Sequence, residues 1–153
     1  MTRMLREFAG ASLSVLALAA ILLAPLPASA RNTEHFFSVR DARESSAGQN
    51  LYDVPFYMKG QKHPGVVKTI GTWEANSTSR GVFRSDEASC HTAFISGIRS
   101  LQQRAENEGG NAIIDIVSVT MNKKTESATQ YRCIAGSTVV HVGLKGKVVK
   151  LAK

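Results

Sequence analysis

The chain has 153 residues, of which 43% are hydrophobic and 20% are charged, and its formal net charge is +7. This length allows one small domain with a single hydrophobic core once a targeting segment is removed. Its two cysteines are too few for a zinc site made of thiolates alone. The excess of positive charge does not by itself specify a partner.

The first thirty residues have the three parts of a secretory signal peptide. Arg3 and Arg6 form a basic start, residues 11–23 are almost wholly apolar, and residues 28–30 form an Ala-Ser-Ala cleavage site. A membrane anchor is the alternative, but the apolar run is shorter than the roughly 20 residues of a membrane span. We therefore predict a cleaved signal peptide, and a single domain at residues 31–153 without a transmembrane segment.

Cleavage after Ala30 by a Sec-type pathway would place the mature chain in the bacterial periplasm. No cysteine follows Ala30 directly, which argues against a lipid-anchored form. Loss of Arg3, Arg6 and Glu7 lowers the formal charge to about +6. An exported basic protein meets anionic lipid headgroups, wall polymers or acidic proteins before it meets DNA.

Residues 85–120 contain the clearest structural pattern, a helix that leads into a strand. Ser85 is a good N-cap, and two acidic residues follow it in the first turn, where the helix dipole favours negative charge. Residues 109–110, both glycine, can end the helix, and residues 112–119 form a β-branched run typical of a strand. The face expected to be buried contains Cys90, Phe94, Ile98, Leu101 and Ala105. The face expected to meet water contains Arg99, Gln102, Gln103, Glu106 and Glu108.

The chain before this helix is expected to contribute two strands. Residues 31–50 are mostly polar and partly irregular, and they could contain a short helix at 41–47. Residues 56–58 and 66–73 are apolar runs on either side of a turn that contains glycine and proline. We predict that these two runs pair as a β-hairpin.

The chain after the helix is expected to contribute the remaining strands. In residues 129–135, period-two alternation puts Tyr131 and Cys133 on one face and Arg132 on the other. In the last strand, apolar residues point to one face, while His141 and Lys145 point to the opposite face. Further lysines follow this strand, a pattern typical of an edge strand that avoids pairing with another chain.

These elements predict an α+β fold with an antiparallel sheet of about four to six strands. One long helix is expected to pack on one face of this sheet. Cys90 on the helix and Cys133 on a strand would form a disulfide from helix to sheet in an oxidising compartment. Two free buried thiols, or half of a metal site, are the alternatives.

The order of elements and several short motifs resemble two related groups of proteins. The motifs FYMKGQKHP, SDEASC, QRAENEGGNAIIDIVS and YRCIAG carry the first resemblance. They are similar to those of small exported proteobacterial proteins of unknown role, often labelled excinuclease ATPase subunits. The second and more distant group is the fold of the Rcs stress-sensing outer-membrane lipoprotein and the YbjQ-type small domains. The resemblance implies an α+β domain with a helix-to-sheet disulfide, and it brings no catalytic residues.

The ATPase label of the first group does not fit this chain. Such an ATPase needs a phosphate-binding loop of the form GxxxxGK[ST]. The nearest run, GLKGKV at residues 143–148, lacks both the spacing and the hydroxyl group that would hold magnesium.

Basic and histidine side chains are the candidate binding residues. The turn with Lys59, Lys62 and His63 is rich in backbone amides and cations, so it could bind an anion. His141 and Lys145 share the outer face of the last strand and could extend this surface. In both places an ordinary solvated surface is the competing interpretation.

The sequence indicates no catalytic residue, metal site or cofactor. It has no HxH, HxxxH or HExxH spacing for a metal and no GxSxG nucleophile motif. His91 follows Cys90 on the helix and is expected at the boundary of its buried face. Asp115 inside the apolar strand is expected on the outer face of the sheet or paired with Arg132.

We predict a non-enzymatic periplasmic protein that acts as a binding or stress-related module in the cell envelope. Its partner would be an envelope protein or an anionic envelope component of unknown identity. The alternative is a small envelope enzyme or metal-handling protein that uses His63 and His91. A nucleic-acid binder is a third hypothesis, and the scarcity of aromatic residues among the basic ones argues against it.

Overall fold

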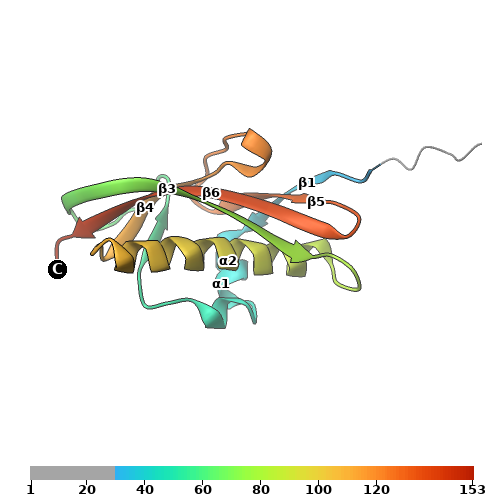
Figure 1. The fold of residues 1–153 in the computed structure, drawn as a ribbon, viewed down its shortest axis with the longest axis horizontal. Coiled ribbons are helices and arrows are strands. Elements are labelled where there is room, and N and C mark those ends of the chain that lie inside the picture. Colours follow the sequence, from blue (N-terminus) through green and yellow to red (C-terminus); the bar gives the residue numbers. More distant parts are fainter. Residues whose placement is uncertain (1–29) are drawn as a thin grey trace, which may run out of the picture.

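The computed structural model describes residues 30–153, so the predicted signal peptide lies outside the described residues. The chain forms an α+β fold in which a mixed sheet is covered on one face by the long helix α2 (Asp86–Asn107) (Figure 1). The predicted fold class is therefore confirmed. Within the described residues, no helix combines the length and apolarity needed to cross a membrane.

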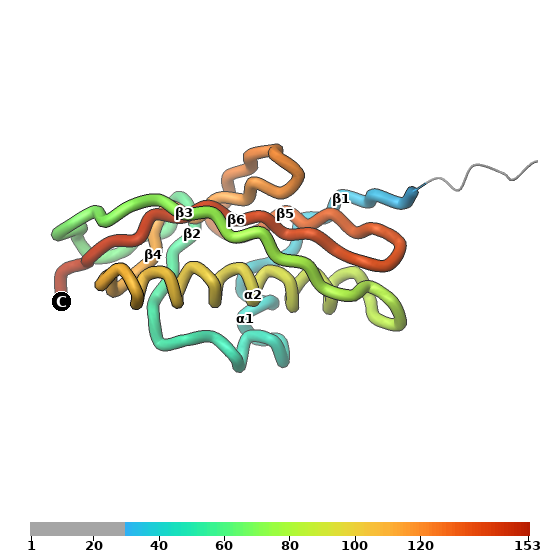
Figure 2. The backbone as a smooth tube through the Cα atoms, viewed as in Figure 1, coloured from blue at the N-terminus to red at the C-terminus, as the bar shows by residue number. Residues whose placement is uncertain are grey.

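The sheet is organised around its longest central strand, β6 (Val139–Leu151). β6 pairs antiparallel with β3 along one edge and with β4 and β5 along the other. The tube in Figure 2 shows β3 and β6 running side by side along the length of the molecule. β1 extends the sheet from β5, and β2 extends it from β4. The other strands are β1 (Thr33–Ser38), β2 (Phe56–Met58), β3 (Val66–Arg80), β4 (Ala112–Ser118) and β5 (Gln130–Ala135). The short helical elements are α1 (Val39–Glu44) and the 3-10 turns η2 (Gly48–Asn50) and η3 (Thr120–Asn122).

Helix α2 begins and ends where the sequence predicts. The Ser85 hydroxyl accepts a hydrogen bond from the Ala88 amide at 3.1 Å, which satisfies one of the free donors of the first turn. Gly109 follows the C-cap with a φ of 74°, a left-handed conformation that glycine adopts without strain.

The hydrophobic core lies between α2 and the sheet. Phe94 stacks on Tyr131 of β5 with ring centroids 4.1 Å apart, and both side chains are buried. Ile98 and Leu101 continue the buried stripe toward the end of the helix. Burying each large apolar side chain stabilises the fold by about 1.5–3 kcal/mol. This face of α2 therefore holds the helix on the sheet.

A disulfide joins α2 to the sheet, as predicted. Cys90 and Cys133 are bonded, their Cα atoms are 6.0 Å apart, and neither residue is exposed to solvent. Cys133 shares the buried face of β5 with Tyr131 and Ala135. The predicted alternation of this strand is therefore correct.

The pairing of β2 and β3 differs from the prediction. They do not form a hairpin, because β2 pairs in parallel with β4 and β3 pairs with β6. The sheet is therefore mixed, and the prediction of a purely antiparallel sheet is wrong in this detail. The connection between β2 and β3 passes the outer face of the sheet, where Tyr57 packs on a second small apolar cluster.

Two further expectations concern the N-terminal segment and the last strand. The short helix expected at residues 41–47 is α1, which spans Val39–Glu44, and strand β1 precedes it within the partly irregular segment 31–50. The last strand is not an edge strand, because β3 and β4 flank it. Two of its lysines pair with acidic residues on those neighbours, Lys145 with Glu74 and Lys147 with Asp115.

We expect the disulfide to contribute a large part of the stability. Cys90 and Cys133 are 43 residues apart, and closing a loop of that length stabilises by about 4 kcal/mol in the chain-entropy model. Cys133→Ser should therefore lower the melting temperature by about 10 °C or more in a calorimetric scan. Reductant should lower the melting temperature of the natural chain in the same way. It should not change a Cys90→Ala/Cys133→Ala variant, and an unchanged melt of Cys133→Ser would contradict this assignment.

Candidate binding groove

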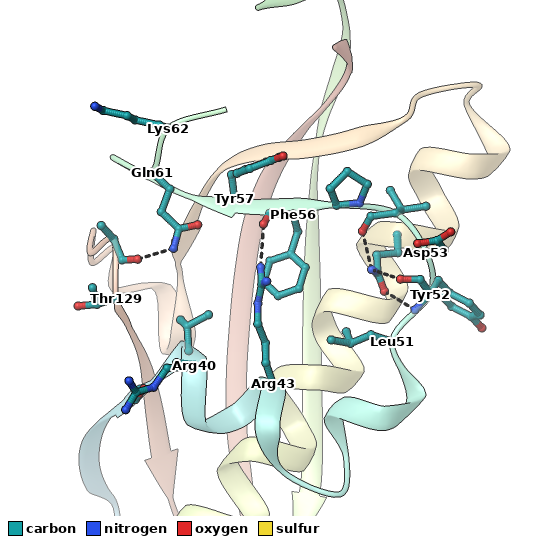
Figure 3. Close-up of a pocket in the computed structure, with 16 residues that line it drawn as sticks. Arg40, Arg43, Leu51, Tyr52, Asp53, Phe56, Tyr57, Gln61, Lys62 and Thr129 are labelled. Atoms are coloured by element: carbon teal, nitrogen blue, oxygen red, sulfur yellow. Dashed lines mark hydrogen bonds between the residues drawn. The ribbon is translucent and has the colours of Figure 1, made fainter. Parts of the chain in front are cut away.

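A groove opens where the sheet divides. β4 and β5 pair with different parts of the same edge of β6, and their outer neighbours β2 and β1 leave a gap beside α1 (Figure 3). The groove has a volume of about 780 Å³, within the range of small-molecule and peptide sites. It is lined by Ser38, Val39, Arg40, Arg43, Leu51, Tyr52, Asp53, Val54, Pro55, Phe56, Tyr57, Gln61, Lys62, Gln102, Ala128 and Thr129.

One wall of the groove is held by a buried glutamine of α2. The Gln102 side chain accepts a hydrogen bond from the Tyr52 amide at 3.0 Å and donates to the carbonyl oxygens of Tyr52 and Val54 at 2.9 and 2.7 Å. The Gln102 amide thus satisfies backbone groups of residues 52–54 that a neighbouring strand would otherwise bond. Gln102 is 1% exposed, so the expectation that it faces water is wrong.

The opposite wall is held by two further side chains. The Gln61 side chain accepts from the Met58 amide at 2.9 Å and donates to the Ala128 carbonyl at 2.8 Å. Arg43 of α1 donates to the Phe56 carbonyl at 2.9 Å, and its guanidinium lies 3.8 Å from the centre of the Phe56 ring. Figure 3 shows Gln61 and Arg43 reaching across the gap from separate elements. Hydrogen bonds to the backbone therefore hold the Gln61 and Arg43 side chains in place where they bridge the groove.

The groove carries more positive than negative charge. Arg40, Arg43 and Lys62 contribute three cations, and Asp53 is the only acidic residue in the lining given above. Burial against Phe56 lowers the pKa of Arg43 below its usual value, although a guanidinium remains charged at physiological pH. Among residues 30–153, neither Arg43 nor Lys62 forms an ion pair. The groove therefore favours an anionic or electron-rich ligand.

The structure separates the five predicted binding residues. Lys62 lines the groove, whereas Lys59 and Lys145 lie on the outer face of the sheet and pair with Asp115 at 3.6 Å and Glu74 at 3.0 Å. The pKa of Asp115 is lowered by its hydrogen bond from Lys147, with a smaller contribution from Lys59. One of the two expectations for Asp115 is thus met, since it lies on the outer face. These lysines are balanced by acidic partners.

The two remaining predicted residues lie far from one another. His63 packs beside Tyr57, with ring centroids 5.6 Å apart, over the end of β6 that contains Val149. His141 is eight residues away from Val149 along β6, which corresponds to about 26 Å. His63 and His141 therefore do not form one surface.

His91 lies in the second turn of α2 and is buried between this helix and the sheet. It is 7% exposed, and its Nδ1 lies 2.7 Å from the Tyr131 hydroxyl. Burial lowers the pKa of His91, although nearby Glu87 acts in the opposite direction. His63 and His91 thus share no site. In the part of the chain that the structure describes, no three His, Cys, Asp or Glu side chains group so as to hold a metal ion.

Arg132 on the outer face of the sheet is buried at the centre of a hydrogen-bond network, a role that the sequence did not indicate. Arg132 is 6% exposed, pairs with Glu34 of β1, and donates to the Thr120 carbonyl. The Thr120 hydroxyl donates to the Arg132 carbonyl at 2.9 Å, and the Ser118 hydroxyl accepts from the Arg132 amide at 3.0 Å. Hydrogen bonding to Arg132 lowers the pKa of Glu34. This network fixes the loop after β4 and explains Arg132 without a ligand.

The role of Gln102 can be tested by substitution with an apolar residue of similar size. Gln102→Leu leaves one amide and two carbonyl groups of residues 52–54 without their partner, so it should destabilise the fold by about 2–4 kcal/mol in urea unfolding. The neighbouring Gln103 is exposed, and Gln103→Leu should change stability by less than about 0.5 kcal/mol. Equal effects of the two substitutions would contradict the proposed role of Gln102.

His91 should make stability depend on pH. Its pKa is lowered in the folded chain, so the unfolded chain binds a proton more readily near its ordinary pKa of 6.5. Stability should therefore be full above that pH and should be lost as the pH falls below it. His91→Gln should flatten this dependence between pH 7.5 and 5.5 in urea unfolding. An unchanged slope in the variant would show that other groups cause the dependence.

We compared the chain with family models, with curated proteins and with solved structures, and none of them matches it.

Proposed function

We propose that this protein is a non-enzymatic binding module of the bacterial cell envelope, exported to the periplasm, and that the groove beside α1 receives its partner. The partner would be an envelope protein or another envelope component that presents an anionic group. The buried disulfide supports an oxidising compartment, because such bonds persist mainly in exported proteins.

The unbalanced charge of the groove is the observation that carries this proposal. On the outer face, Lys145 pairs with Glu74, and Lys59 and Lys147 share Asp115, so two carboxylates offset most of the charge of these three lysines. In the groove, Arg43 and Lys62 have none among the described residues, and Arg40 forms only exposed contacts with its helix neighbours. An anionic ligand can therefore gain more in the groove than on the outer face.

The shape of the groove supports binding of an extended segment or a small group. Val54 and Phe56 are buried apolar lining residues, and polar atoms of Ser38 and Thr129 lie around them. A mostly apolar floor with a few directed polar groups is the usual composition of a ligand site. The described residues of the groove contain no nucleophile paired with a base, which favours binding over catalysis.

Site-specific crosslinking in living cells tests this proposal. A photoreactive residue at Thr129, in the groove, should give a discrete adduct, whereas the same residue at Glu106, on the exposed side of α2, should not. Arg40→Gln/Lys62→Gln should reduce the Thr129 adduct roughly tenfold, because each lost charge weakens binding by about 1 kcal/mol at most.

The matched control removes the same charge elsewhere. Lys68 and Lys150 are exposed partners on β3 and β6, outside the groove, so Lys68→Gln/Lys150→Gln should keep the Thr129 adduct. Melting temperatures of both variants should stay near that of the natural chain, since all four side chains are exposed. Equal loss in both variants, or equal adducts at Thr129 and Glu106, would contradict a specific groove.

A further inference from the structure

The loop between β3 and α2 displays an aromatic side chain entirely in solvent. Phe83 is 102% exposed, and its neighbour Val82 is 42% exposed. Neither residue belongs to the apolar clusters of the domain. The two side chains form an apolar tip of the loop, and we call residues 80–84 the tip loop.

The backbone at Phe83 is unfavourable for the residue that occupies it. Its φ of 62° lies in the left-handed region, which a bulky side chain adopts only at a cost in strain. Glycine would fit this turn without strain, and a polar residue would avoid exposing a ring to water. Folding alone therefore gives no reason for a phenylalanine here, which points to a use outside the domain.

Two arginines flank this tip and have no acidic partner among the described residues. Arg80 and Arg84 are both exposed, and neither takes part in an ion pair within residues 30–153. The loop that contains Met121 can be compared with the tip loop, because Met121 is also an exposed apolar residue with a left-handed backbone. It is 58% exposed and has a φ of 52°. There the nearby Lys123 and Lys124 pair with Glu34 and Glu126. Of these two loops, the tip loop is the one that combines an exposed apolar tip with arginines that no described acidic side chain balances.

The tip loop lies at the same end of the molecule as the start of the domain. Arg31 pairs with Asp86 in the first turn of α2, and the Gly81 amide donates to the Thr138 carbonyl at 2.9 Å in the β5–β6 turn. Figure 1 shows the start of β1, the β5–β6 turn and the β3–α2 loop together at this end. The predicted apolar run at residues 11–23 precedes this point by only a few residues. The predicted signal peptide would tie this end of the domain to the membrane until its cleavage.

We propose that the tip loop is a membrane-binding element for anionic lipid bilayers. Val82 and Phe83 enter the boundary between headgroups and acyl chains, and Arg80 and Arg84 contact lipid phosphates. An aromatic ring is favourable at that depth, and nearby arginines are attracted to the negative surface. This element shares no residue with the groove, so it does not depend on the function proposed there.

Vesicle sedimentation tests the membrane-binding element. The protein is expressed from the full sequence and purified in the form the cell makes, with its N-terminus read by intact mass. It should sediment with vesicles of phosphatidylethanolamine and phosphatidylglycerol, and much less with phosphatidylcholine vesicles. Phe83→Gly should weaken partitioning roughly tenfold, because an apolar ring no longer leaves water. Arg80→Gln and Arg84→Gln should each weaken it by about fivefold and reduce its salt dependence.

Phe83→Gly is informative because it should not impair folding. Glycine relieves the left-handed strain, so the melting temperature should stay the same or rise while vesicle binding falls. Met121→Gly is the matched control, since it removes an exposed apolar side chain at a similar φ on another loop and should leave binding unchanged. A Phe83→Trp variant should bind and should show quenching by brominated lipid tails beyond that of Trp73 in the natural chain.

Three results would overturn the proposal. They are absence of sedimentation with anionic vesicles, equal sedimentation with phosphatidylcholine vesicles, and unchanged binding in Phe83→Gly. A concentration-dependent dimer that is lost in Phe83→Gly, without vesicle binding, would instead assign the tip loop to a second copy of the chain.

Discussion

The close packing of α2 on β6 is the constraint on which the other features depend. Gly97 in the middle of the helix lies over Leu144, where an added Cβ would come within 3.1 Å of the leucine side chain. Glycine in a helix interior costs about 1 kcal/mol relative to alanine, and here that cost is offset by a buried contact. Gly146 likewise leaves room below Ile113 and Ile116. Since β3, β4 and β5 all pair with β6, this contact sets the positions of the groove and of the tip loop.

The features that could be predicted from the sequence are those with local signals. The Ser85 cap, the helical spacing of apolar residues and the β-branched run after it identify α2 and β4. The predicted export to an oxidising compartment was the basis for predicting the disulfide. The order of strands depends on contacts between distant residues, for which the sequence carries no comparable signal. β2 is only three residues long, and its parallel partner β4 follows more than fifty residues later. The sequence of a short apolar strand does not indicate which other strand it pairs with.

The groove was mostly hidden from sequence reasoning for a similar reason. It combines α1, residues 51–57, the turn at Lys62 and the start of β5, and only Lys62 was among the predicted binding residues. Gln102 carries no signal of its role, because a glutamine beside another glutamine on an amphipathic helix resembles any solvated position. The basic residues on the outer face were predicted as a surface, but their acidic partners come from other strands. Which lysines are neutralised by acidic partners therefore became clear only from the structure.

The way in which residues 51–55 are held has a consequence for motion. Most of the domain is tied together by long antiparallel ladders and a disulfide, whereas the polar contacts of this wall with α2 come from two side chains, Gln102 and Arg99. Local opening follows the weakest set of contacts and does not require the rest of a domain to unfold. Rotation of Gln102 would release three backbone contacts at once and would leave this wall held mainly by buried Val54 and by the hydrogen bond from the Ile113 amide to the Pro55 carbonyl. Amide hydrogen exchange in this segment would then be faster than in β6, and a ligand that contacts this wall would slow it.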